Sequence, residues 1–288
     1  MKICAITMVY RDHWALSQWY DHFARHLGAE NLFIVAHGAD RALPALCPGA
    51  NILTVPRDQL DGFDGMRDRV LNGFQAGLGA VYDWVIRTDA DELICLDPEI
   101  FASFADLLAV QERDVVFALG LNVVERPDDP PLDKGASALS TRSGALFSGL
   151  YSKAWAVRKG LPLLRHGVGL RRKVLESYPL SLPAGVYLAH LKYANRTALR
   201  RSNRHRREIA NSGGKGLPGA AWQKPLLAER KFYARFEALP EQPWDACAED
   251  ALARITADPV RDTGKGVLRA QNIQFDARTT LPGRIRRF

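Results

Sequence analysis

Apolar positions in the first third of the chain follow two different spacings. Short, mostly apolar runs typical of buried strands cover Lys2–Met8, Asn31–Ala36, Asn51–Val55 and Val81–Thr88. Between them, Trp14–Leu27 and Met66–Leu78 carry apolar residues at helical spacing. Strands that alternate with helices in this way predict an α/β fold with a largely parallel, doubly wound sheet.

The loops that follow these strands are expected to lie together. In a parallel sheet, ligands bind at the carboxyl ends of the strands, where the loops converge. We therefore expect one edge of the sheet to gather Tyr10–His13, His37–Asp40, Arg57–Gly65 and Asp89–Glu92.

The rest of the chain is less regular. Further strands are expected at Asp114–Val124, Ala154–Arg158 and Val186–Leu191. Arg126–Gly144 is rich in Pro, Asp, Gly and Ser without periodicity, which predicts a long loop that acts as a lid. From Asn195 the pattern becomes helical and basic, so we expect a catalytic α/β domain over residues 1–194 and a helical, basic extension over 195–288.

The strongest chemical signal is an acidic cluster between two apolar stretches. Asp89, Asp91 and Glu92 follow the run that begins at Trp84, and their charges repel one another unless cations or donors compensate. A hard divalent cation with oxygen ligands is the natural compensator. In an extended chain, alternation would turn Asp89 and Asp91 to the same side, toward one ion. The alternative is a solvated acidic turn.

This stretch, through Pro98, resembles the Asp-x-Asp motif of GT-A type glycosyltransferases, in the form found in family 2 and its relatives. Met66–Gly73 matches the helix that precedes that motif in the family, with a basic residue and an asparagine, and Thr7–Asp12 matches the loop that holds the nucleotide base. The resemblance implies a GT-A-like, Rossmann-related sheet flanked by helices. It also implies sugar transfer from a nucleotide-sugar donor, with a UDP-sugar favoured, to a glycan or lipid-linked acceptor, with Mn²⁺ or Mg²⁺ as cofactor.

The resemblance also implies a set of site residues. A late histidine often completes the metal shell in such enzymes, so the expected ligands are Asp89, Asp91 and His190; a core histidine is the alternative for His190. The residues expected to bind the nucleotide-sugar are Thr7, Tyr10, Arg11, Asp40, Arg67, Asn72, Asp89 and Lys192. Asp91 is expected to act in catalysis. Asp133 is the chosen candidate for the general base, among several carboxylates in or beside the long loop.

One departure from the family concerns the base. Many members carry an acidic residue after the second strand, and here that stretch offers His37 or Asp40, which leaves the identity of the base open.

Net charge and length add further expectations. The 288-residue chain carries a formal charge of +7, with basic residues concentrated in Arg200–Arg207 and Arg284–Arg287. Such a run favours anionic partners, so Arg200–Arg207 is either a peripheral contact with the inner face of a membrane or a solvated face. There is no apolar run of roughly 18 residues and no signal-peptide pattern, and the cysteine spacing matches no zinc site; these features favour a cytoplasmic protein.

Two other functions compete with the glycosyltransferase. A metal-dependent nucleotidyl- or phosphotransferase would use the same carboxylates, but the phosphate loop G-x-x-x-x-G-K-[ST] is absent from the sequence. A non-catalytic, basic module that binds polyanions is the other alternative. Nucleic acid is not an expected partner, because the basic residues lack interleaved aromatic side chains.

Overall fold

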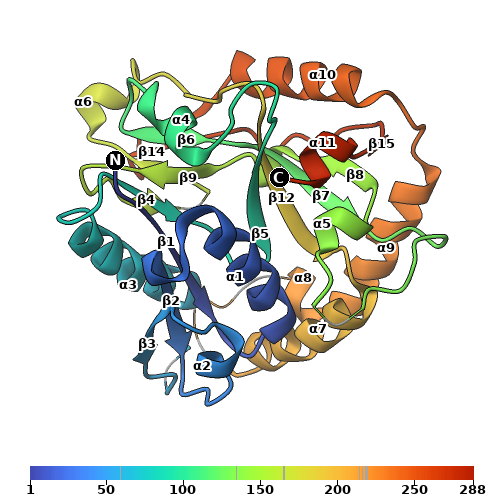
Figure 1. Ribbon diagram of the computed structural model, residues 1–288, viewed down its shortest axis with the longest axis horizontal. Coiled ribbons are helices and arrows are strands. Elements are labelled where there is room, and N and C mark those ends of the chain that lie inside the picture. Colours follow the sequence, from blue (N-terminus) through green and yellow to red (C-terminus); the bar gives the residue numbers. More distant parts are fainter. Residues whose placement is uncertain (59, 134, 165, 214, 216, 218–219) are drawn as a thin grey trace.

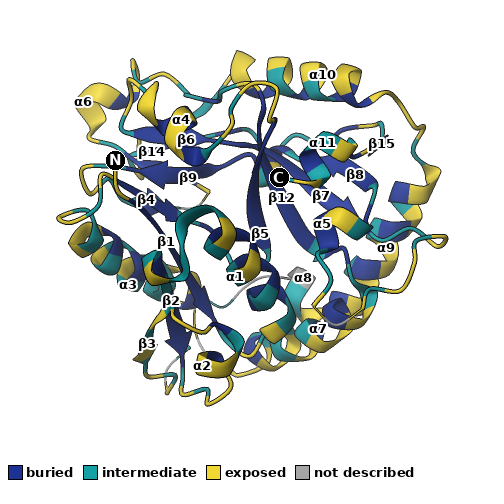
Figure 2. Ribbon diagram, in the orientation of Figure 1, coloured by how far each residue is buried: buried dark blue, intermediate teal, exposed yellow. Residues whose placement is uncertain are grey.

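The computed structural model describes residues 1–58, 60–133, 135–164, 166–213, 215, 217 and 220–288. Its strands form three sheets, and helices cover their outer faces (Figure 1). The strands are largely buried, whereas the helices expose their outer sides (Figure 2). None of the helices in the described ranges is long and apolar enough to cross a membrane.

The central sheet confirms the predicted α/β fold class. Within the described chain it has six strands, in the order β3 (Asn51–Val55), β2 (Leu32–His37), β1 (Ile3–Val9), β4 (Trp84–Arg87), β9 (Ala154–Val157) and β6 (Val115–Phe117). The first four strands are parallel, whereas β9 runs antiparallel to both β4 and β6. The acidic motif follows β4 and therefore lies at the carboxyl edge of the parallel strands, as a GT-A-like arrangement requires.

Alternation along β1 explains how helices cover both faces of this sheet. Ile3, Ala5 and Val9 belong to the same core as residues of α1 (His13–Leu27), including Trp19. Cys4, Ile6 and Met8 pack in a second cluster with Leu71 of α3 (Phe63–Leu78). Successive side chains of a strand point to opposite faces, so α1 and α3 lie on opposite sides of β1.

A second sheet continues directly from the acidic motif. Its order is β15 (Thr279–Thr280), β8 (Gly144–Phe147), β7 (Leu119–Val124), β12 (Val186–Tyr193) and β5 (Glu92–Leu96). β12 runs antiparallel to β5 and parallel to β7, so His190 lies opposite Glu92 on one side and Asn122 on the other. The predicted strand Asp114–Val124 is divided at Ala118 into β6 and β7, which belong to different sheets.

The third sheet is small and antiparallel. It contains β10 (Leu163–Leu164), β11 (Gly167–Gly169), β14 (Val267–Arg269) and β13 (Val260–Asp262). The helices that follow β12 are α7 (Arg196–Ala210), α8 (Ala220–Gln223), α9 (Pro225–Ala238) and α10 (Trp244–Ala257). β14 pairs with β11, and β15 pairs with β8, so strands from both sides of residue 194 share sheets. The domain boundary at residue 194 stays a prediction.

The remaining elements are short connections. They are the α-helices α2 (Leu43–Leu46), α4 (Phe104–Ala109), α5 (Ala138–Thr141), α6 (Arg172–Leu175) and α11 (Gly283–Arg286), and the 3₁₀-helices η1 (Ala29–Asn31) and η2 (Gly149–Tyr151).

The predicted lid over Arg126–Gly144 contains α5 and is fastened to the rest of the fold. Gln18 of α1 donates to the carbonyl of Ala136 at 3.0 Å and accepts from the amide of Ala138 at 2.6 Å. The buried guanidinium of Arg142 donates to the carbonyls of Pro130 and Ala194. Residue 134 lies outside the described residues. Lid motion stays a prediction, and these contacts would have to break for it.

Candidate active site

A cavity of about 800 Å³ opens at the carboxyl edge of the central sheet. Its walls come from the loop after β1, the first turns of α3, the turn between β4 and β5, the segment 149–154, the end of β12, the inner side of α7 and the small sheet. The sequence predicts the ligand site at this edge.

The acidic motif forms a tight turn that joins two sheets. Residues 88–91 connect β4 to β5, and the amide of Glu92 donates to the carbonyl of Asp89 at 3.0 Å. The carboxylate of Glu92 in return accepts from the amide of Asp89 at 2.9 Å. The expectation of an extended chain is therefore wrong at this point, and Asp89 and Asp91 contact different partners.

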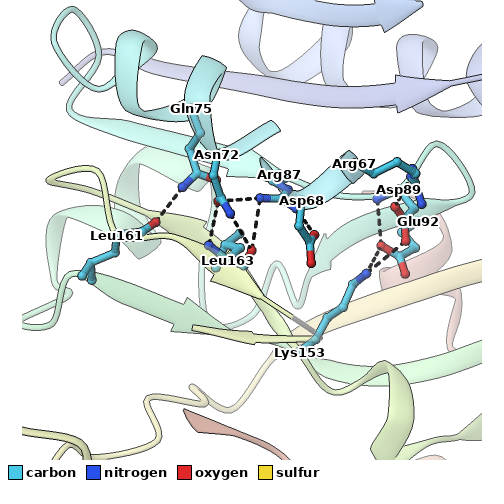
Figure 3. A network of polar contacts seen from close by, with 10 residues as sticks. All are labelled: Arg67, Asp68, Asn72, Gln75, Arg87, Asp89, Glu92, Lys153, Leu161 and Leu163. Atoms are coloured by element: carbon cyan, nitrogen blue, oxygen red, sulfur yellow. Dashed lines mark hydrogen bonds and ion pairs between the residues drawn. The ribbon is translucent and has the colours of Figure 1, made fainter. Parts of the chain in front are cut away.

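Asp89 lies between two cationic side chains. Its carboxylate is 3.1 Å from Arg67 Nη2 and 3.3 Å from Lys153 Nζ, and Lys153 also contacts Glu92 at 2.8 Å (Figure 3). Burial raises the pKa of Asp89, but Lys153 and Arg67 lower it further, so the net pKa lies below its usual value. Burial and the two neighbouring aspartates raise the pKa of Glu92, although Lys153 opposes them.

Arg67 belongs to α3, whose polar side chains form hydrogen bonds to β4 and β10. Asp68 accepts from Arg87 at 2.7 Å (Figure 3). Asn72 accepts from Arg87 at 2.7 Å and pairs with both backbone groups of Leu163. Arg67 lines the cavity, whereas Asn72 fixes α3 to β10 and does not line the cavity; donor binding by either residue stays a prediction.

Asp91 has a different environment. His190 Nε2 lies 3.4 Å from its carboxylate, and Arg206 Nη2 lies at 3.7 Å. Burial raises the pKa of Asp91, but His190 and Arg206 lower it to about 2.

The imidazole of His190 is fixed by its neighbours. Its Nδ1 is 2.9 Å from the Asn122 side-chain oxygen, which only accepts, so Nδ1 carries the hydrogen. The Tyr151 ring stacks on the imidazole at 3.7 Å between centroids. A Cβ at Gly120 would lie 2.1 Å from the Tyr151 backbone, so glycine there permits this contact. Burial lowers the pKa of His190, although Asp91 opposes this effect. In a neutral ring with its hydrogen on Nδ1, the Nε2 lone pair faces Asp91.

Asp91 and His190 are chemically suited to hold a divalent cation between them. A carboxylate and an imidazole lone pair that face each other at 3.4 Å are two electron-rich donors. In the described part of the chain, no group of three or more His, Cys, Asp or Glu side chains is arranged to hold a metal. Mg²⁺ and Mn²⁺ at nucleotide sites commonly take one or two protein ligands and complete their shell with phosphates and water. The pair fits such a site, whereas the Asp89 carboxylate already contacts Arg67 and Lys153.

Two other predicted residues reach the cavity. Lys192 lines it beside Asp91, and burial together with Arg206 lowers its pKa to about 8. Tyr10 lines it as well, but the guanidinium of Arg57 lies 3.6 Å from the centre of its ring, which covers one face. His37 also lines the cavity, with Nδ1 2.8 Å from Arg57.

The structure places four other predicted residues away from the described cavity wall. Thr7 is fully buried within β1. The guanidinium of Arg11 lies 5.3 Å from the centre of the Tyr10 ring, and Asp40 forms an ion pair with His13 at 2.7 Å. Asp133 is exposed in the segment before α5, so its position gives no support to its role as the general base.

The main cavity residues that the sequence does not indicate are Lys153 and the residues of α7 that face the cavity. Lys153 is 8% exposed and directly precedes β9. No local sequence pattern indicates that it contacts the acidic motif. Ser202, His205, Arg206 and Ile209 of α7 all line the cavity. The stripe at i, i+3, i+4 and i+7 is the signal that marks one helix face. The stripe is hard to recognise in the sequence, because arginines stand between its members.

A glycine-rich run follows α7. Residues 214–219 have the G-x-G-x-x-G spacing, but only residues 215 and 217 of this run belong to the described chain.

Comparisons with known proteins do not assign this chain to a family. No family model and no curated protein matches it. Among solved structures, S. aureus TarS is 14% identical over 80% of this chain and 43% of that chain, with a TM-score of 0.33. A 4-diphosphocytidyl-2C-methyl-D-erythritol synthase is 14% identical over 46% and 64%, with a TM-score of 0.29. A glycosyltransferase involved in the glycosylation of the major capsid of PBCV-1 is 8% identical over 55% of this chain and 60% of that chain, with a TM-score of 0.27. The chain thus spans less than two thirds of each, and likenesses this low carry no functional argument.

Proposed function

We propose that this protein is a metal-dependent glycosyltransferase that moves a sugar from a nucleotide-sugar, with a UDP-sugar favoured, to a glycan or lipid-linked acceptor. The observation that carries the proposal is the Asp91–His190 pair, which faces an 800 Å³ cavity beside Lys192. Breaking the bond between the anomeric carbon and the diphosphate leaves negative charge on the diphosphate. Lys192 and Arg206 line the same cavity, and their positive charge would stabilise that leaving group.

The roles of the side chains follow from their contacts. Asp91 and His190 would hold Mn²⁺ or Mg²⁺, whose chemistry is to neutralise the phosphate oxygens of the donor. Asn122 keeps the His190 Nε2 lone pair directed at the ion site. Asp89 keeps 42% of its side chain exposed, so it can still accept a hydrogen bond from a donor hydroxyl while Arg67 and Lys153 hold it.

The test is calorimetry with UDP in the presence of Mn²⁺ and in excess chelator. We expect binding that requires the metal, and slow release of UDP when UDP-glucose or UDP-N-acetylglucosamine is supplied. Equally tight binding in chelator would contradict a diphosphate held through a metal. Release of pyrophosphate from a nucleoside triphosphate and a sugar phosphate would instead identify a nucleotidyltransferase, so product analysis separates the two classes.

The outer side of α7 supports a second, peripheral contact. Arg200, Arg201, Arg204 and Arg207 are exposed. We propose that this face binds anionic lipid at the inner, cytoplasmic side of a membrane, because clustered arginines gain about 1 kcal/mol each near such a surface. Sedimentation with phosphatidylglycerol vesicles should exceed that with phosphatidylcholine vesicles and fall at high salt. Equal binding to both kinds of vesicle would contradict this contact and favour the alternative, a face of α7 that only contacts solvent.

A further inference from the structure

α7 presents one face to the cavity and another to solvent. Ser202, His205, Arg206 and Ile209 line the cavity. The helix packs against β12 and α8, and its ribbon lies below the lower ends of β5 and β12 in Figure 1. Arg206 and Arg207 are therefore neighbours in sequence with opposite surroundings: Arg207 is exposed, whereas the side chain of Arg206 is 15% exposed.

The position of α7 is fixed by contacts with α9 and with the cavity wall. Asn203 is buried and donates to Glu229 of α9 at 3.1 Å. The His205 ring meets the Tyr10 ring edge-on, with 5.6 Å between centroids. Arg206 donates to the Asn203 side-chain oxygen at 3.2 Å, and its guanidinium lies 5.9 Å from the Trp222 ring. These contacts hold the guanidinium at the cavity wall, 3.7 Å from Asp91.

Two cations and two carboxylates lie close together on this part of the cavity wall. Arg206 and Lys192 are the cations beside Asp91, and Asp91 and Asp12 are the carboxylates that act on Arg206. Among the described residues Lys192 forms no ion pair; its ammonium lies 5.2 Å from the centre of the Tyr193 ring, and Arg206, Asp91 and Glu229 act on its charge. A divalent cation on Asp91 would add two positive charges to this half-buried wall. That added charge favours an anionic ligand beside Arg206 and Lys192, and a diphosphate is such a ligand.

We propose that Arg206 binds the diphosphate of the nucleotide-sugar and stabilises it as the leaving group. This inference rests on the proposed function. In the transfer, the bond between the anomeric carbon and the phosphate oxygen breaks with its electron pair on the diphosphate. The acceptor hydroxyl oxygen forms the new bond, and its proton passes to a base or to water. Arg206 releases Asp91 and turns its planar donors to the phosphate oxygens, a geometry that guanidinium matches well.

The experiment compares Arg206→Gln with the matched control Arg207→Gln by calorimetry in solution without membranes. The probes are UDP and pyrophosphate with Mn²⁺, and uridine without phosphate. Arg206→Gln should weaken UDP and pyrophosphate by about 10- to 100-fold and leave uridine unchanged, since a charged hydrogen bond to phosphate is lost. Arg207→Gln should match the wild type for all three probes. Arg206→Lys should recover part of the loss.

Each other outcome overturns the proposal. If UDP and uridine weaken together in Arg206→Gln, the residue only shapes the cavity. Unchanged UDP affinity would remove Arg206 from the site while the proposed function stands. If the wild-type protein binds neither UDP nor pyrophosphate with Mn²⁺, the proposed function fails, and this inference fails with it.

Discussion

Asp89 and Asp91 are separated by a single residue, yet they belong to two different electrostatic regions. On the Asp89 side, Arg67 and Lys153 supply positive charge permanently. On the Asp91 side, the nearest partner is an imidazole whose pKa burial lowers, and Arg206 is more distant. The two carboxylates of the motif are therefore compensated differently, Asp89 by two cations in close contact and Asp91 by an imidazole and one more distant guanidinium.

The cause of the difference is the turn between β4 and β5. The turn directs Asp89 toward α3 and Lys153, and it places Asp91 against the end of β12, where the amide of Leu191 donates to the Asp91 carbonyl at 2.7 Å. A straight strand would have given both carboxylates one environment. An acidic motif therefore needs its backbone geometry before both of its members can be called metal ligands.

The largest expected effect comes from removing a cation on the Asp89 side. Lys153→Met leaves the buried Glu92 and its neighbour Asp89 without their shared cation, and we expect a loss of about 3 kcal/mol in the free energy of unfolding. Denaturant titration measures it. The double variant Lys153→Met/Glu92→Gln should recover part of the loss. A Lys153→Met protein as stable as wild type would show that the network contributes little.

The next effect tests the Asp91 side. Asp91→Asn keeps the shape but loses the charge, so Mn²⁺-dependent UDP affinity should fall by about 100-fold or more with little change in the melting temperature. Asp89→Asn should retain metal-dependent binding, because its carboxylate contacts Arg67 and Lys153. Titration with Mn²⁺ at fixed UDP compares the two variants. If both lose metal equally, the division between the two regions is wrong.

A smaller effect should follow from Asn122→Ser. The variant loosens the contact that keeps the His190 Nε2 lone pair toward Asp91, so Mn²⁺ affinity should fall by about 10-fold. Uridine affinity should stay constant. Unchanged Mn²⁺ affinity would mean that His190 is a core residue, which is the alternative that the sequence leaves open.

The smallest effect concerns His22, which belongs to neither region but contributes to the pH dependence of stability. His22 is buried, and its Nε2 contacts the Ile94 carbonyl at 2.8 Å. Burial lowers its pKa to about 3, so the unfolded chain takes up the proton first. Stability is fully present above pH 6.5 and falls as pH drops toward the folded pKa, by on the order of 1 kcal/mol over the first unit. His22→Gln should make melting temperature depend less steeply on pH between 6.5 and 5.5, and His26, His37 and His166, whose pKa values burial also lowers to about 4, should keep the rest of the slope. An unchanged slope would point to other groups.

The sequence predicts the first half of the fold because its information is local. The strands from Lys2 to Thr88 and the helices between them have clear periods, and the structure has β1 to β4 and α1 to α3 in that region. The parallel arrangement places the acidic motif at the binding edge. His190 was placed near Asp91 by the same reasoning, since strand ends meet at one edge.

The rest of the site depends on contacts between distant parts of the chain. Lys153 meets Asp89 through strand pairing that no local period encodes. In α7, basic residues on all sides hide that one face packs against the cavity. Asp133 was chosen by its type and its loop, and loop composition says nothing about which wall a segment meets.

The pairing of β14 with β11 sets an order on how the site can form during synthesis. Val267 and Leu268 lie opposite Gly169 and Val168, and β14 contributes Val267 and Arg269 to the cavity wall. A chain that leaves the ribosome from its N-terminus can fold the parallel strands and the acidic turn well before β14 emerges. Until then the carboxylates face water on an open edge. Because this pairing also closes a long loop, we expect the capacity to bind a nucleotide to appear in the last and slowest phase of folding.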